Sequence, residues 1–509
     1  MIFVHLYTFP GVSMSTRSLA IAVAVALSGQ LAAGTLAAHA AGGDITTACQ
    51  GTLARARFTL SANCDTTVTL TVPNGLTVIG AGHEITAHDP NPAAGPSGLF
   101  DGPVVTNAGT TMNLRNLTVR GTGFTSFGCN AGATPTVGLL YNNASGAITD
   151  VKVLDITQHS TCQTVHSVQL RADAGPQTVN VTGSTVSIFQ RTALLVQGDV
   201  TVHASGNTFG PPDPLTPNPG GVAQNTVQIG SPALAAPSSG SLTGNTIIGS
   251  SYGRPAAAST GLLLAGAAHL QVSHNTFSGH GTDIGVSFFG RNTDITIAYN
   301  KIDRSAEDRP GFEDSYGYGV NVTDESRPYT TLICNTFAGW KHNLRNTTQA
   351  PCITTAADLP CVTVDEPVVL HLDAHVAAGR PDLTWRLATG ALPDGLTLHH
   401  DGSITGTPTE TGTTAATIEV TDPTEGSSSR EFVFCVQPAP TPTPQPTTPT
   451  PTHNPTPTHR PGPVRSAPPT GTELAKSGGG ASRWLLGVSS ALLAGGLLLA
   501  GVTRRGRRR

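Results

Sequence analysis

The sequence predicts an all-β protein whose largest part, residues 41–350, is a right-handed parallel β-helix. Charged residues make up only 12% of the 509 residues, whereas glycine (58) and proline (38) are abundant. This composition favours short strands and turns over long helices. A degenerate Asn-x-apolar motif recurs through the body of the chain, and short alternating segments such as 270–273 and 295–298 precede it. Together these features are typical of a coil built from short strands.

The clearest copies of the motif contain Asn207, Asn245, Asn275, Asn300 and Asn335, which are 38, 30, 25 and 35 residues apart. A period in the twenties that is stretched by insertions indicates a solenoid. We expect each asparagine to adopt the left-handed bend conformation and its amide to stack along the coil. The apolar residues that follow should point inside: Phe209, Ile247, Phe277, Ile302 and Phe337. The repeat resembles that of pectin-lyase-like β-helix proteins, and a pair of β-sandwiches is the alternative.

Residues 351–437 predict a second, smaller domain. Segment 361–436 alternates as seven short strands, with Trp385 as an expected core residue. The stretches Leu-Pro-Asp-Gly-Leu at 392–396 and Gly-Thr-Pro at 406–408 resemble immunoglobulin-like, cadherin-related modules of bacterial surface proteins. The resemblance implies a small Ig-like β-sandwich. Because cadherin relatives bind calcium, it also makes Asp422 and Glu425 candidate calcium ligands, although full calcium motifs are missing and no metal or cofactor is assigned.

The first 40 residues are typical of a secretory signal peptide. Arg17 precedes the apolar run 19–27, and small residues lead to Ala38-His39-Ala40. We expect cleavage between Ala40 and Ala41, and Met14 makes a better start than Met1. The alternative is an uncleaved N-terminal anchor, for which the apolar run is short.

The other end has three parts in order: a short motif, an apolar span at 484–502 and a basic tail at 504–509. The motif is Leu474-Ala475-Lys476-Ser477-Gly478. Segment 474–509 resembles a sortase sorting signal of the Leu-Ala-x-Thr-Gly type that actinobacteria use, with Ser477 where threonine is usual. The resemblance implies attachment by sortase to the peptidoglycan of a Gram-positive cell wall, with the span holding the chain in the membrane before sorting. A plain transmembrane anchor is the alternative.

Residues 438–473, between domain and motif, are rich in proline and threonine and predict an extended spacer long enough to cross a cell wall. Lysine is rare and arginine frequent, which indicates a GC-rich coding bias and agrees with an actinobacterial source. The lysines are Lys152, Lys301, Lys341 and Lys476. A net charge of −4 and the lack of a basic stripe in the middle of the chain argue against nucleic acid as a partner.

Eight cysteines in an exported chain predict four disulfides. Neighbouring pairs are the simplest hypothesis: Cys49–Cys64, Cys129–Cys162, Cys334–Cys352 and Cys361–Cys435. Zinc ligation is the alternative, but no Cys-x-x-Cys spacing occurs.

Candidate catalytic residues are few, and none is assigned. Gly279-His280-Gly281 resembles a polygalacturonase motif, but Asn292-Thr293-Asp294 follows it instead of preceding it, and no Asp-Asp pair occurs. Glycosidic cleavage needs two carboxylates flanking one bond, so His280 and Asp283 remain only candidates.

An acidic, aromatic insertion between Asn300 and Asn335 supplies the other candidates. Glu313 and Asp314 are candidate carboxylates, and Tyr316 and Tyr318 are candidate binding residues, because aromatic rings beside carboxylates suit sugars. A solvated loop with internal ion pairs is the alternative. This insertion and 211–221 both follow the Asn-x-apolar bend, so both should emerge on one side of the coil. We expect a groove between them, with these four residues on one of its two walls.

From these features we expect a cell-wall-anchored surface protein whose β-helix binds a glycan or a neighbouring surface. A wall-tethered polysaccharide lyase or glycoside hydrolase is the alternative, because β-helices of this kind host many such enzymes.

Overall fold

The structure is a computed structural model. It describes residues 43–122, 124, 136–158, 164–210, 222–252, 258–305, 317–376, 382–424 and 426–440. The predicted signal peptide, nearly all of the predicted linker and the predicted sorting signal lie outside these ranges. Within them the helical segments are α2 (Ile45–Ala48) and two 3₁₀ segments, η1 (Pro92–Gly98) and η2 (Arg327–Tyr329), which confirms the all-β prediction. No described helix has the length and apolar character needed to cross a membrane.

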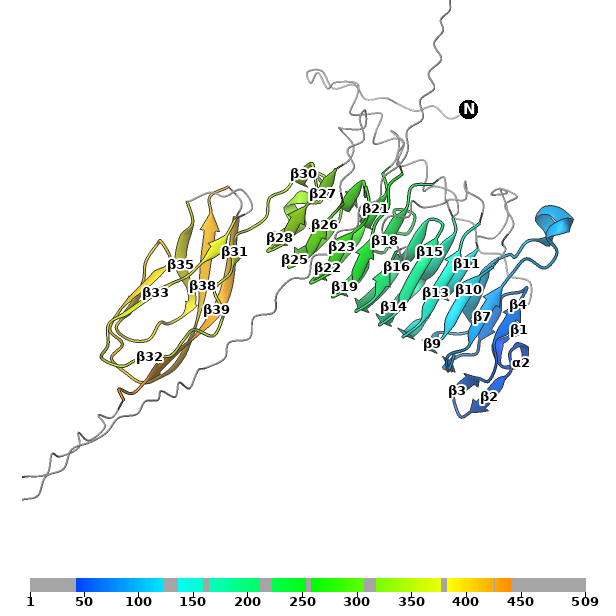
Figure 1. Cartoon of the computed structure of the whole chain (residues 1–509), viewed down its shortest axis with the longest axis horizontal. Helices are drawn as coiled ribbons and strands as arrows, with labels where there is room; N and C mark the ends of the chain where they lie inside the picture. Colours follow the sequence, from blue (N-terminus) through cyan, green and yellow to red (C-terminus); the bar gives the residue numbers. More distant parts are fainter. Residues whose placement is uncertain are drawn as a thin grey trace, which may run out of the picture. The chain divides into compact units, whose positions relative to one another are not determined.

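The body of the chain is a coil in which each turn adds strands to parallel stacks (Figure 1). Stack 1 begins where β1 (Gly43–Asp44) pairs with β5 (Leu70–Val72), and it continues through β8 (Pro103–Asn107), β11 (Val137–Asn142), β14 (His166–Thr182), β16 (Thr192–Ser205), β18 (Asn225–Ile229), β21 (Thr260–Ala265), β24 (Ile284–Phe289), β27 (Tyr318–Asn321) and β30 (His342–Arg345). Stack 2 contains β3 (Arg57–Leu60), β6 (Thr77–Ile79), β9 (Thr111–Arg115), β12 (Ser145–Thr149), the second halves of β14 and β16, β19 (Ser238–Thr243), β22 (Ala267–Ser273), β25 (Thr293–Ala298) and β28 (Thr330–Ile333).

Stack 3 is a separate ten-stranded sheet. Its strands are β4 (Cys64–Thr66), β7 (Glu84–Ala87), β10 (Thr118–Gly121), β13 (Lys152–Ile156), β15 (Thr185–Phe189), β17 (Thr208–Phe209), β20 (Thr246–Ile248), β23 (Thr276–Ser278), β26 (Lys301–Asp303) and β29 (Thr336–Ala338). Counterpart strands of successive turns pair in parallel throughout the three stacks. The body is therefore a parallel β-helix, and the alternative of two β-sandwiches, which have antiparallel sheets, is wrong.

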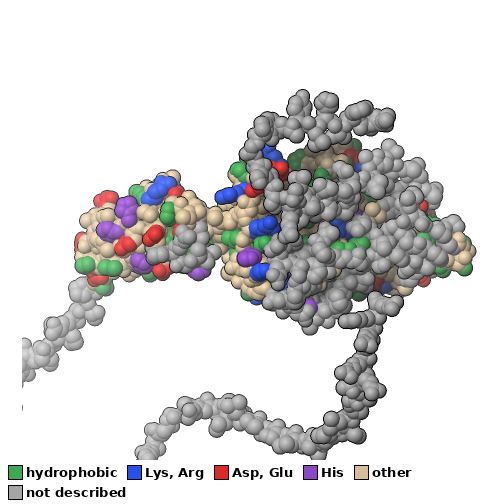
Figure 2. All heavy atoms as spheres, turned by 90° about the horizontal axis from the view of Figure 1, so that it is seen from above, with side chains coloured by type: hydrophobic (Ala, Val, Ile, Leu, Met, Phe, Trp, Pro, Cys, Tyr) green, Lys and Arg blue, Asp and Glu red, His purple; other side chains and the backbone are tan. Residues whose placement is uncertain are grey.

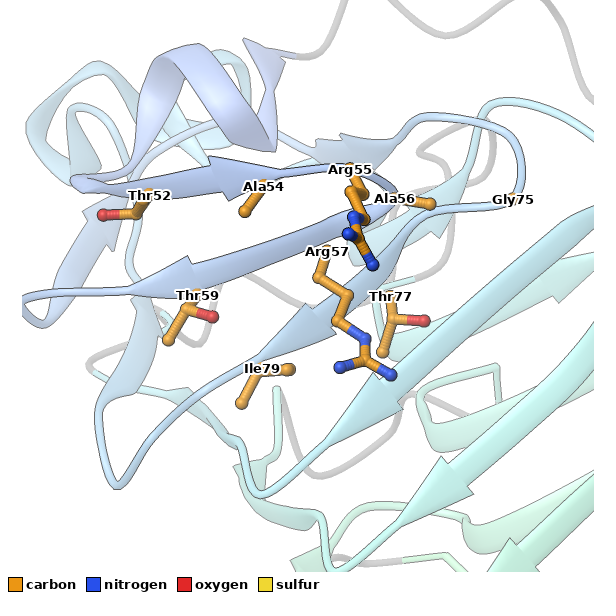
Figure 3. A pocket seen from close by; sticks show the side chains of 9 residues that line it. All are labelled: Thr52, Ala54, Arg55, Ala56, Arg57, Thr59, Gly75, Thr77 and Ile79. Carbon is orange, nitrogen blue, oxygen red and sulfur yellow. The ribbon is translucent and has the colours of Figure 1, made fainter.

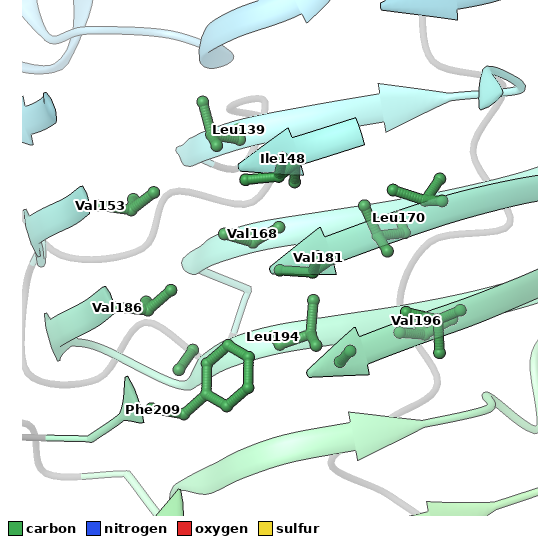
Figure 4. Close-up of a cluster of buried hydrophobic side chains, with 14 of the residues drawn as sticks. Leu139, Ile148, Val153, Val168, Leu170, Val181, Val186, Leu194, Val196 and Phe209 are labelled. Carbon is green, nitrogen blue, oxygen red and sulfur yellow. The ribbon is translucent and has the colours of Figure 1, made fainter. Parts of the chain in front are cut away.

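Inward side chains from all three stacks form one continuous core (Figure 4). Residues at most 2% exposed include Leu139, Val168 and Leu194 of stack 1, Ile148 and Val181 of stack 2, and Val153, Val186 and Phe209 of stack 3. The apolar residues of the repeat behave as predicted, because Phe209, Ile247, Phe277 and Ile302 are buried, while Phe337 in the last turn is half-buried against the core.

The predicted asparagine ladder lies at the corner between stacks 2 and 3, where Asn207, Asn245, Asn275, Asn300 and Asn335 are all buried. The backbone N–H and the Nδ2 of each asparagine donate to Oδ1 of the next at 2.9–3.0 Å. Gln349 Oε1 accepts from Asn335 in the same way and ends the ladder. The ladder satisfies backbone donors that the bend removes from strand pairing.

The left-handed bend lies one residue earlier than predicted. The residues before the ladder asparagines have φ between 55° and 64°: Gly206, Gly244, His274, Tyr299 and Cys334. An asparagine whose amide must point inward cannot also form the outward reversal, so the preceding residue reverses the chain. In an earlier turn Asn116 takes this left-handed position and Leu117 fills the buried corner.

Disulfides clamp both ends of the coil. At the start, the Cys49–Cys64 bond holds a cap in which β2 (Gly51–Ala54) forms an antiparallel hairpin with β3. At the end, Cys334–Cys352 joins the last ladder turn to the following segment. With Cys361–Cys435, three of the four expected pairs are present; Cys129 and Cys162 lie outside the described residues. Structural disulfides of this number are typical of an exported protein.

The C-terminal module, residues 351–437, contains seven strands in two sheets around one core. One sheet has the order β32 (Val362–Thr363), β39 (Gly426–Gln437), β38 (Gly412–Asp422), β35 (Thr384–Gly390), and the other β33 (Val368–His371), β37 (Ser403–Gly406), β36 (Leu396–Leu398). A further pair, β31 (Cys352–Ile353) and β34 (Ala374–His375), lies beside them. Trp385 is 3% exposed and belongs to the shared core, as predicted.

Candidate functional site

The two candidates from the Gly-His-Gly region have separate structural contacts. His280 is half-buried, and its Nδ1 lies 3.2 Å from Ser305 Oγ in the next turn. Asp283 is 3% exposed, and its Oδ2 accepts backbone N–H groups of Tyr252 (3.0 Å) and Ser259 (2.8 Å). A buried carboxylate used in this way holds a corner of the coil, so Asp283 does not have the position of a hydrolytic acid.

Tyr318 differs from its expected place on an open groove wall. It is the first residue of β27 and only 9% exposed, because its ring stacks on His342 of the next turn (centroids 5.4 Å apart) and lies beneath the Arg345 guanidinium, 4.9 Å away. Glu313, Asp314 and Tyr316 lie outside the described residues.

The strands that flank the two long insertions connect the same stacks. Residues 211–221 join β17 of stack 3 to β18 of stack 1, and 306–316 join β26 to β27. Three coil steps separate these corners, or about 14 Å at the spacing of paired strands. The insertions themselves lie outside the described residues, so the groove between them remains a hypothesis.

Of the two candidate calcium ligands the structure describes only Asp422. Asp422 is 1% exposed, and its Oδ1 accepts from Thr424 N and Oγ1 at 2.7 Å. Glu425 lies outside the described residues, as do the predicted cleavage residues and the predicted sorting motif. Among the described residues no three His, Cys, Asp or Glu side chains gather in a group that could hold a metal.

A hollow of about 560 Å³ lies on the outer face of stack 2 at the N-terminal cap (Figure 3). Arg55 and Arg57 lie side by side in it, next to the side chains of Thr59 and Thr77. Both arginines are exposed, so water screens their charges. The hollow therefore contains no charged group that is shielded from solvent. On the face shown in Figure 2, charged side chains of the described residues are scattered among uncharged ones.

The outer face of stack 1 carries amide and hydroxyl side chains that bond one another. Gln169 Nε2 donates to Gln197 Oε1 (2.8 Å), Asn225 Nδ2 donates to Gln228 Oε1 (3.0 Å), and Thr260 Oγ1 donates to Asn225 Oδ1 (3.0 Å). Gln169 and Gln228 occupy the same column of the stack with Leu195 between them, so equivalent amides recur every second turn, or about 9.6 Å apart. An array of this kind can hydrogen-bond the hydroxyls of an extended chain of sugars.

At the start of the same strands lies a second cluster, which we call the His166–Arg191 site: His166, Arg191, Thr192 and Tyr252. His166 and Thr192 are direct partners in neighbouring turns. Thr192 is fully buried, and neither its Oγ1 nor His166 Nδ1 has a hydrogen-bond partner among the described residues. Buried polar atoms are nearly always paired, so these two atoms are exceptions within the described part of the coil.

Arg191 gives the site its charge. The guanidinium is half-buried, and its Nη1 donates to the carbonyl oxygen of Ala223. Burial lowers the pKa of Arg191 to about 10, and the nearby Tyr252 opposes this shift, so the group is a cation at neutral pH. No carboxylate pairs with it among the described residues. Burial, followed by the neighbouring Arg191 charge, lowers the pKa of His166 to about 3.

Sequence reasoning missed this site because the inside–outside alternation breaks there. Val168 and Leu170 point into the core, so strict alternation would also send His166 inward. The strand pairing skips one residue between His166 and Val168, and this irregularity turns the ring to the other face. A signal was available in the sequence: polar residues open three successive stack 1 strands at His166, Thr192 and Asn225.

The lowered pKa of His166 predicts how the stability of the fold depends on pH. Its pKa is lowered on folding, so as the pH falls below about 6.5 the unfolded chain binds a proton that the folded chain does not. The neutral His166 therefore contributes fully to folding stability near neutral pH, and this contribution is lost as the pH falls towards 3. We expect His166→Gln to reduce the stability difference between pH 7 and pH 4 by about 2 kcal/mol, after allowance for partial exposure. Denaturant titrations of both proteins would measure it, and equal pH slopes would contradict the assignment.

Comparison with known proteins gives one family match, to the family described as "Putative Ig domain", over residues 350–437. No curated protein sequence matches the chain. The C-terminal module is thus Ig-like by sequence as well as by its two-sheet arrangement.

Several solved structures show distant likeness. Tailspike protein 3 of bacteriophage CBA120 is 11% identical, with coverage of 68% of this chain and 59% of its own and a TM-score of 0.27. A periplasmic alginate epimerase double mutant is 8% identical, with coverage of 59% and 67% and a TM-score of 0.27. A "putative alpha-galactosidase" from Bacteroides fragilis is 22% identical, with a TM-score of 0.16, and each chain is covered over only 19%. Likeness at this level carries no functional inference, and the fold assignment stands on the strand registers.

Proposed function

We propose that this protein is a surface protein of a Gram-positive bacterium, attached to the cell wall, whose β-helix binds a polysaccharide along the outer face of stack 1. The observation that carries the proposal is the group of amide and hydroxyl side chains that bond one another on neighbouring strands of this face. We infer a right-handed coil, because nearly all connections between parallel strands have that hand.

The repeat suits an extended polymer better than a small molecule. Gln169 and Gln228 present the same group two turns, or about 9.6 Å, apart, so more than one sugar can make an equivalent contact, and weak contacts add up through multivalency. Leucines alternate with the glutamines on this face, as in Leu195, Gln228 and Leu263 of successive turns. Apolar patches between amides suit the apolar faces of sugar rings.

Gln228→Leu tests the binding face. The neighbouring turns carry leucine at the same position, so the fold should tolerate the change. We expect the purified full-length chain to bind at least one soluble polysaccharide in a screen of plant, fungal and bacterial glycans, and Gln228→Leu to weaken that binding at least fivefold. The matched control is Gln271→Leu, an exposed glutamine on the outer face of stack 2. No binding by the parent chain, or equal losses in both variants, would contradict the proposal.

Eliminative cleavage of an acidic polysaccharide has less support, because burial lowers the pKa of His166 to about 3 and so makes its imidazole a weak base. Hydrolysis is less well supported, because it needs two carboxylates flanking one bond, whereas the nearby Asp283 is buried in backbone contacts.

Wall attachment rests on the order of motif, apolar span and basic tail. Deletion of residues 474–478 should move the protein from the purified wall into the detergent extract, because the sortase would lose its cleavage site while the span remains. Equal extraction of the parent and the deletion variant would indicate a plain membrane anchor instead.

A further inference from the structure

Strand β2 of the N-terminal cap leaves one edge of its backbone open. Among the described residues β2 pairs only with β3, and all of its residues are exposed. Ser61 N donates to Gln50 O, so in the alternation of an antiparallel pair residues 50, 52 and 54 turn their backbone groups toward β3. The N–H and C=O groups of Gly51 and Leu53 therefore point away from β3, about 7 Å apart. An edge of this kind accepts a further strand.

The two faces of this open edge differ in character. On the outer face, side chains of β2 line the hollow of about 560 Å³ that also contains Arg55 and Arg57 (Figure 3). On the opposite face Leu53 is the partner of Phe58 in the hairpin, and it is 57% exposed although Phe58 is buried. A strand added at the edge would therefore meet cations on one face and an apolar side chain on the other.

The two arginines have no acidic partner among the described residues. The nearest described ion pairs along the chain belong to Arg120, which bonds Glu84 and Asp155. The residues that line the hollow include no aspartate or glutamate. Exposed cations of this kind speed the association of an anionic partner and select against cationic ones, although each contact contributes little in water.

The charges favour an acidic peptide over a second copy of this chain. Pairing of β2 with β2 of another copy would bring the arginines of both copies together, and charges at an edge are a common means of preventing such self-pairing. A peptide strand offers backbone partners for Gly51 and Leu53, and its side chains alternate between the two faces. Acidic residues at every second position would face Arg55 and Arg57, while apolar residues between them would face Leu53.

We propose that β2 is a docking edge for an extended acidic peptide of a partner protein. The peptide pairs with Gly51 and Leu53 as an added antiparallel strand, which is the more stable pairing per residue, and its carboxylates lie beside Arg55 and Arg57. Acidic and apolar residues alternate in the partner segment. The docking edge belongs to the N-terminal cap, so it is separate from the polysaccharide-binding face that we propose for stack 1.

The direct test uses the purified full-length chain and three short synthetic peptides with blocked ends. In the first peptide valine and glutamate alternate, and in the second glutamine replaces glutamate. The third is the first with N-methyl groups on its valine amides, which removes the donors for β2 and keeps the charge. We expect the first peptide to bind about tenfold more tightly than either of the others, and to slow hydrogen exchange at residues 51–54. No binding of the first peptide, or equal binding of all three, would overturn the proposal.

Variants of the chain separate strand addition from attraction by charge. Leu53→Pro removes an outward N–H that β3 does not use, so the hairpin should persist while binding of the first peptide falls about tenfold. Leu53→Ala keeps that N–H and should retain more of the binding. Arg57→Gln should weaken binding severalfold and reduce its salt dependence, whereas Arg327→Gln, at another exposed arginine, should leave it unchanged. Thermal unfolding of each variant checks that the fold is intact.

Each alternative occupant of the docking edge gives a different result. If the parent chain sediments as a dimer that Leu53→Pro converts to a monomer, a second copy fills the edge and the peptide proposal is wrong. If polygalacturonate displaces the first peptide at an equal concentration of charge, the hollow recognises charge alone and the proposal is also wrong. Equal effects of Arg57→Gln and Arg327→Gln would likewise contradict it, and none of these outcomes bears on the stack 1 face.

Discussion

The C-terminal module is expected to lose about 4.5 kcal/mol of stability when Cys361 and Cys435 are both replaced by alanine, because their bond closes a loop with a sequence separation of 74. Without the bond the unfolded chain gains the conformational freedom of that loop. For a module of this size the loss corresponds to a fall of about 20 °C or more in its melting temperature. Calorimetry of the full-length chain under oxidising conditions would measure it.

The Cys49–Cys64 pair provides the internal comparison. It closes a loop with a separation of only 15, for which the same chain-entropy argument gives about 3 kcal/mol. The double alanine variant there should therefore destabilise the N-terminal cap by less than the first variant destabilises the module. The reverse order would show that native packing around the bonds, and not loop length, dominates their contribution.

Asn275→Ala is expected to destabilise the coil by about 4 kcal/mol, because one substitution leaves several buried groups unsatisfied. Asn275 Oδ1 accepts from both Asn245 N and Nδ2, and its own Nδ2 donates to Leu242 O, Ser273 O and Asn300 Oδ1. Water cannot replace these hydrogen bonds, because Asn275 is only 1% exposed. Denaturant unfolding followed by circular dichroism would give the free energy of unfolding.

Thr276→Ala is the matched control for the ladder, because Thr276 is the next residue and its side chain is exposed. Its effect should stay within about 0.5 kcal/mol. Since a solenoid is stabilised by contacts between neighbouring turns, the ladder variant should also raise hydrogen exchange in β20, β23 and β26 more than in β7 and β10. Uniform exchange across all turns, or similar losses in both variants, would contradict a local role for the ladder.

The sequence by itself determined the coil, the ladder and the C-terminal module. An asparagine followed two residues later by an apolar side chain is a local pattern, and its recurrence requires that similar turns stack, so Asn207 to Asn335 could be placed in one column before any contact was known. Neighbouring cysteines and the Gly-Thr-Pro stretch at 406–408 are local in the same sense. What the pattern could not place was the residue that reverses the chain, because the inward position of each asparagine is a consequence of the hydrogen bonds between turns.

Only the tertiary structure decided where the His166–Arg191 site lies and which way its side chains point. Turns of the coil differ in length because of insertions, so residues that are 25 or more positions apart become neighbours only when the strands are in register. His166 faces outward because the pairing skips a residue after it, and Tyr318, expected on an open wall, is covered by His342 and Arg345 of the next turn. Burial and the lack of a counter-charge at Arg191 arise from that stacking, and no single stretch of sequence contains them.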